Sequence, residues 1–106
     1  AIIKDMKELN AEEVADTFKI IIPKIEKGEM KFFIIRDLFL NFDTYKGKIV
    51  EAIGKSTVTI KAGDMAALRT MYNSDTGSMN TVLEIMVKKG TLTDEQITEI
   101  KEQRKS

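Results

Sequence analysis

The chain has 106 residues, 42% of them hydrophobic and 32% charged, and its 17 basic and 17 acidic side chains cancel. This composition excludes a disordered chain, and the zero net charge excludes a global field that would attract nucleic acid or membranes. Cysteine and histidine are absent, which removes disulfides, thiolate chemistry and the most common general base and metal ligand. We therefore expect one domain over residues 1–106, without enzymatic activity, metal or cofactor.

The N-terminal half shows two helical patterns. Asn10 and Glu13 have the spacing of a capping box that opens a helix. Apolar residues then follow at helical spacing: Val14, Phe18, Ile21, Ile22 and Ile25. Pro23 lies inside this pattern and should kink or split the helix. A short separate helix is expected over 2–9. The run 30–42 is apolar nearly all round, which is typical of a helix at the centre of a bundle.

Membrane insertion is not expected from any part of the sequence. The most hydrophobic run, 30–42, is interrupted by Arg36 and Asp37 and is shorter than the roughly 20 residues that a spanning helix needs. The N-terminus lacks a charged segment followed by an apolar segment and a small-residue cleavage site. These features predict a cytoplasmic protein without a membrane partner.

Residues 44–62 fit two structures. In one, 45–53 forms a helix that Gly54 ends, with Ile49 and Ile53 directed inward. In the other, 48–53 pairs with 56–61 in a β-hairpin that turns at Gly54 and Lys55. The alternation after Lys55 favours at least a short strand there, so a helix followed by a strand is the preferred interpretation.

The tripeptide Gly54-Lys55-Ser56 matches the end of a phosphate-binding loop, but its surroundings do not. That pattern places a glycine five positions before Gly54, where this chain has Ile49. The residues after Lys55 should also begin a helix whose amides hold the phosphate, and they have the pattern of a strand instead. We expect no nucleotide hydrolysis.

The C-terminal half has three helical segments, over 65–72, 79–89 and from 94 to about Gln103. Lys88, Lys89 and Gly90 suit the end of the second of these helices. Thr93 and Gln96 form a second capping box, which opens the third. No internal repeat is evident. The whole pattern predicts a mainly α protein, a compact bundle of five or six short helices, with the hairpin near 48–61 as the β structure left open.

Methionine supplies the first candidate functional surface. Its flexible thioether suits surfaces that repack against partners, although core filling is its more common use. Because short helices leave some apolar faces uncovered, we predict a protein-interaction, regulatory or assembly domain that binds another protein or itself as a homodimer. The residues predicted to carry this role are Met65, Met71, Tyr72, Met79 and Met86.

Lysine supplies the alternative. The segment 45–61 contains four lysines against one acid, Glu51, which is the largest local excess of positive charge. On a hairpin, these lysines would form a wing that touches phosphates without reading bases. The alternative function is therefore a nucleic-acid-associated protein. The residues concerned are Lys46, Lys48, Lys55 and Lys61.

Overall fold

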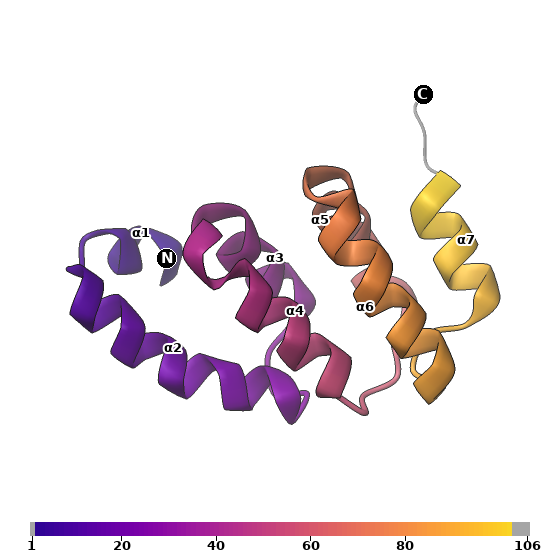
Figure 1. Ribbon diagram of the computed structural model, residues 1–106, viewed down its shortest axis with the longest axis horizontal. Coiled ribbons are helices and arrows are strands. Elements are labelled where there is room, and N and C mark those ends of the chain that lie inside the picture. Colours follow the sequence, from indigo (N-terminus) through magenta and orange to yellow (C-terminus); the bar gives the residue numbers. More distant parts are fainter. Residues whose placement is uncertain (1, 103–106) are drawn as a thin grey trace.

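The computed structural model describes residues 2–102, most of which lie in helices (Figure 1). The predicted mainly α fold is confirmed, although the described residues form seven α-helices instead of the five or six expected. The helices of this part of the chain are α1 (Ile2–Lys7), α2 (Ala11–Glu26), α3 (Phe32–Asn41), α4 (Lys46–Lys55), α5 (Met65–Ser74), α6 (Thr76–Lys89) and α7 (Asp94–Glu102), with short 3-10 helices at Asp43–Tyr45 and Ala62–Asp64. Gln103, the expected end of the last helix, lies outside the described residues.

The helices are arranged in two layers (Figure 1). One layer contains α2, α4 and α6 side by side, with α4 packed against both neighbours. The other contains α3, α5 and α7, and α1 packs against α3. The layers meet where α3 contacts α4 and where α5 contacts α6. Successive helix pairs therefore stack on one another, as they do in helical repeat proteins.

The two central helix pairs have related sequences as well as related positions. Helices α3 and α5 each have ten residues and begin at Phe32 and Met65, 33 positions apart. The pattern Asn-x-Asp-Thr follows in both, at 41–44 and again at 73–76. The repeat is short and was not evident from the sequence pattern alone. It becomes recognisable because both copies connect a helix of one layer to a helix of the other.

Helix α2 begins as predicted and is not split. The Asn10 side chain accepts a hydrogen bond from the Glu13 N–H at 2.8 Å, and the Glu13 carboxylate accepts from the Asn10 N–H at 3.1 Å. Pro23 lies inside the helix, which continues to Glu26. The ring of Pro23 is exposed, so the Lys19 carbonyl that loses its donor lies on a side of the helix open to water.

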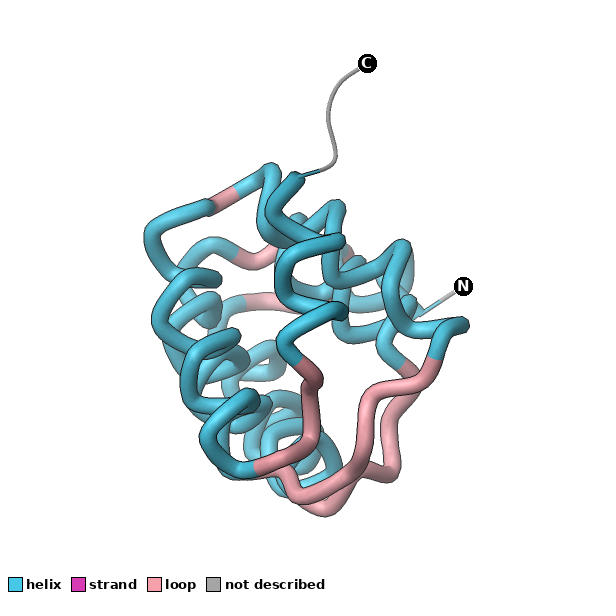
Figure 2. The backbone as a smooth tube through the Cα atoms, turned by 90° about the vertical axis from the view of Figure 1, so that its right-hand side faces the viewer, coloured by secondary structure: helices cyan, strands magenta, loops and turns pink. Residues whose placement is uncertain are grey.

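The hairpin left open over 48–61 is absent; of the preferred helix followed by a strand, the helix forms and the strand does not. Residues 46–55 form α4, and 56–61 form an extended segment without strand pairing; Figure 2 shows helices and loops but no strand in the described part of the chain. The helix is favoured because Ile49, Ala52 and Ile53 recur at helical spacing and are all at most 1% exposed. Gly54 lies within the last turn of this helix instead of in a hairpin turn.

The extended segment 56–61 is attached to the end of the molecule that contains α6 and α7. The Ile60 N–H donates to the Thr91 carbonyl at 2.8 Å, and the Gln96 side-chain amide donates to the Ile60 carbonyl at 3.3 Å. Gln96 also completes the predicted capping box with Thr93, each accepting from the other's backbone N–H at 3.0 Å. One glutamine side chain therefore caps α7 and holds the extended segment.

Candidate interaction grooves

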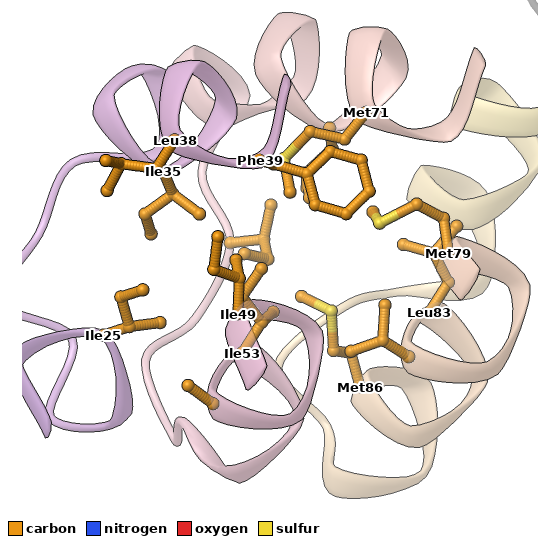
Figure 3. Close-up of a cluster of buried hydrophobic side chains, with 14 of the residues drawn as sticks. Ile25, Ile35, Leu38, Phe39, Ile49, Ile53, Met71, Met79, Leu83 and Met86 are labelled. Carbon is orange, nitrogen blue, oxygen red and sulfur yellow. The ribbon is translucent and has the colours of Figure 1, made fainter. Parts of the chain in front are cut away.

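The predicted methionine surface is inside the protein. Met65, Met71, Met79 and Met86 are between 0 and 5% exposed. Figure 3 shows Met71 and Met79 directed toward the ring of Phe39, in the core between the two layers. Tyr72 is half-buried and packs against the same core. In this fold these methionines fill space and are not available to a partner.

The four candidate lysines do not form a common surface. Lys46, Lys48 and Lys55 belong to α4, and Lys61 belongs to the extended segment. Lys55 lies between two carboxylates, 3.8 Å from Glu26 and 3.7 Å from Glu51. Without the hairpin, the wing of lysines that would have followed a phosphate backbone is not formed.

Lys46 has a structural role at the junction of the two repeated helix pairs. Its ammonium lies 3.7 Å from a carboxylate oxygen of Asp43 and 3.7 Å from one of Asp75, the two aspartates of the repeated pattern. It also lies 5.0 Å from the centre of the Phe39 ring, in a cation–π arrangement. The side chain is only 22% exposed, so little of it can reach a ligand.

Asp75 is the N-cap of α6. Its carboxylate accepts hydrogen bonds from the Ser78 N–H at 3.1 Å and from the Ser78 hydroxyl at 3.0 Å. These two bonds, together with the Lys46 ammonium, hold the pKa of Asp75 below its ordinary value of 3.8. Asp75 is therefore a carboxylate at neutral pH. Its contacts with Ser78 and Lys46 give it a structural role at the start of α6.

One hollow on the layer of even-numbered helices lies between α2 and α4, and is named here the α2/α4 groove. It encloses about 590 Å³. Its wall and floor contain Phe18, Ile22 and Pro23 from α2. Ala52 of α4 and Tyr45, from the 3-10 helix before α4, complete them. The rings of Phe18 and Tyr45 are stacked, with centroids 4.1 Å apart and planes 5° apart. Since Phe18 is only 2% exposed, the half-buried ring of Tyr45 forms the accessible aromatic part of the floor.

Charged side chains form the rim of this groove: Lys19, Glu26, Lys48, Glu51 and Lys55. The two carboxylates are both paired with Lys55, at the end where α2 and α4 finish. Near the other end, Lys19 pairs with Asp16 at 3.6 Å, in an exposed contact that water weakens. Lys48 is exposed and, within residues 2–102, has no ion-pair partner.

A second hollow lies on the other side of the same helix, between α4 and α6, and is named the α4/α6 groove. It encloses about 440 Å³ and has an almost entirely apolar lining. Two glycines on α4, Gly47 and Gly54, stand opposite Val82 and Ile85 of α6. Ile85 is 41% exposed. The Lys89 ammonium donates to the Gly54 carbonyl at 2.8 Å and so links the C-terminal end of α4 to α6.

These grooves were not identified from the sequence. A usable signal was present, since Gly47 and Gly54 lie seven residues apart and so occupy one face of a helix. That signal has meaning only once 46–55 is known to be helical. Among the residues whose burial is described, the large apolar side chains exposed outside the two grooves are Leu9, Ile20, Phe33 and Leu40.

The described residues contain no cluster of three acidic, histidine or cysteine side chains that could hold a metal ion. Within the same range, no helix is long and apolar enough to cross a membrane. Comparison of the chain with protein-family models, with curated proteins and with solved structures gives no match.

Proposed function

We propose that the protein is a non-catalytic interaction domain that binds a partner protein along the face formed by α2, α4 and α6. The observation that carries the proposal is the pair of adjoining grooves on either side of α4, which share Glu51 and Lys55 as their common rim. Grooves with apolar floors and a few polar rim groups are the usual form of peptide and ligand sites. This face takes the place of the methionine surface as the contact region.

The two glycines of α4 support this choice of face. Glycine inside a helix costs about 1 kcal/mol relative to alanine. A Cβ atom at Gly47 would meet no other atom within 4 Å, and one at Gly54 would make ordinary contacts with Val82 and Ile85 at 3.6 and 3.7 Å. Packing of α4 therefore does not require either glycine. Gly47 is exposed, so it keeps the α4/α6 groove open and lets another backbone approach α4 closely, whereas Gly54 is buried beside Val82 and Ile85.

Nucleic acid is the weaker candidate. Of the four lysines that suggested it, Lys46 is held by two aspartates and Lys55 by two glutamates. Phosphate binding depends on cations that can exchange counterions for phosphate oxygens, and ion-paired lysines would first have to leave their partners.

The experiment compares affinity capture by three forms of the purified protein: the wild type, Ile85→Glu and Ile20→Glu. A charge at Ile85 places a carboxylate in the α4/α6 groove, and we expect partners to be retained roughly tenfold less, as for a central contact residue. Ile20 is 63% exposed on α2 and lines neither groove, so the same substitution there is the matched control. Sedimentation of each form tests whether the partner is a second copy.

Circular dichroism establishes that both variants remain folded before capture is compared. Proteins retained by the wild type and by Ile20→Glu but lost with Ile85→Glu support the proposed face. Equal retention by all three forms, or equal loss with both variants, would show that binding does not use the α4/α6 groove.

A further inference from the structure

We propose that the α2/α4 groove takes a peptide segment of the partner that presents an apolar, preferably aromatic, side chain next to a carboxylate. This inference rests on the proposed function and gives the chemistry of one half of the contact face. It assigns separate roles to the floor of the groove and to one lysine on its rim.

The floor selects the apolar part of the segment. Tyr45 presents its ring, which is stacked on the buried ring of Phe18, and Ile22 and Pro23 extend the apolar wall along α2. The volume of about 590 Å³ lies within the range of roughly 300–1,000 Å³ that is typical of ligand sites, and exceeds what one aromatic side chain occupies. An aromatic group can lie against Tyr45 and Pro23 without any rearrangement of the core, since Phe18 beneath them is only 2% exposed.

The rim selects the charge. Glu26 and Glu51 already have a cation in Lys55, at the far end of the groove. Lys48 has no ion-pair partner in the described part of the chain, so its ammonium can pair with a ligand without giving up another carboxylate. A carboxylate is the side-chain group that complements it, whereas a second cation would be repelled.

The spacing of the floor and the lysine fixes the spacing of the ligand groups. Tyr45 is the N-cap of α4 and Lys48 lies in its first turn, three residues later, and both line the same groove. Both groups of the ligand can therefore come from one residue and its immediate neighbour. The segment need not be long to use both.

Phenylacetate is a minimal probe with the required groups, and phenylacetamide is its uncharged match. We expect millimolar phenylacetate to shift the backbone amide signals of Lys19, Tyr45 and Lys48 in two-dimensional NMR spectra. The acid should bind roughly two- to fivefold more tightly than the amide, as expected for one exposed ion pair. The difference should decrease as salt is raised.

Two lysine variants test the assignment of charge. Lys48→Gln should remove the preference for the acid and leave the binding of the amide unchanged. Lys61→Gln, a change of an exposed lysine that does not line the groove, should preserve the preference. Phenethylamine, which replaces the carboxylate by an ammonium, should bind more weakly than the amide.

The proposal is overturned if acid and amide bind equally, if shifts map outside the α2/α4 groove, or if Lys48→Gln keeps the preference. Absence of any shift at millimolar concentration also overturns it. None of these outcomes affects the capture experiment, because Ile85 lies in the α4/α6 groove and Lys48 does not. Failure of the ligand chemistry can therefore be told from failure of the contact face.

Discussion

Gly28 shows how much one residue can hold together in a small helical protein. It follows α2 with a φ angle of +73°, a conformation that glycine adopts at no steric cost. A Cβ atom built there would lie 1.8 Å from a methyl group of Val58. The end of α2 and the extended segment 56–61 can therefore approach each other only because this side chain is missing.

Gly28→Ala should destabilise the protein more than Gly90→Ala. Gly90 also has a positive φ, +85°, but a Cβ atom there would meet nothing within 4 Å. We expect Gly90→Ala to lower the free energy of unfolding by about 1–2 kcal/mol through backbone strain alone. Gly28→Ala should lower it further, because Val58 must also move. Urea denaturation of the two variants measures the difference. Equal losses would mean that the contact with Val58 relaxes without cost.

Asp75 predicts how stability depends on pH. Because its pKa is lowered in the folded state, its carboxylate stabilises the fold above the ordinary pKa of 3.8, and this contribution is lost as the pH falls through the lower folded value. Asp75→Asn keeps a cap acceptor but loses the charge. The variant should be less stable than the wild type at pH 7, and the gap should narrow below pH 3.8. Denaturation midpoints at the two pH values test this; a gap independent of pH would contradict it.

At the scale of single elements, α4 is a helix whose own sequence has a low helix propensity. Both Gly47 and Gly54 lie in its ten residues. The helix survives because Ile49 and Ile53 are fully buried between the layers. Tertiary packing therefore supplies what the local propensity lacks.

Gly47→Ala should raise the free energy of unfolding by about 0.5–1 kcal/mol, since the added methyl group improves helix propensity and meets no neighbour. The same methyl group narrows the α4/α6 groove, so retention of the partner should fall while stability rises. Thermal denaturation and the capture experiment measure the two effects. A variant that gains stability and keeps full binding would show that the groove does not need its glycine.

The fate of residues 44–62 shows what the sequence could and could not predict. The helical spacing of Ile49 and Ile53 was present in the sequence, and so was a plausible hairpin turn at Gly54. The two patterns differ in what they bury, and only the neighbouring α2 and α6 decide between them. Capping boxes at Asn10 and Thr93 were predictable because both partners lie within four residues of each other.

At the scale of the whole molecule, the helical character and the burial of the apolar stripes followed from periodicity. The grooves did not, because a groove is a property of two helices and the sequence does not state which helices are neighbours. The methionines show the same limit. The spacing of Met79 and Met86 placed them on one face of α6, but whether that face meets solvent or Phe39 depends on α3 and α5, which lie elsewhere in the chain.

The stack of helix pairs has two different ends. Helix α7 packs mainly against α5 and α6, whereas the α2/α4 groove is built from the opposite end. In a stack where each helix pair contacts only its neighbours, the pair at one end can unfold locally while the rest stays folded. We therefore expect amide protons of α7 to exchange with solvent in molecules whose α2/α4 groove is still intact. Loss of the last helix and loss of the proposed ligand should then be separate events.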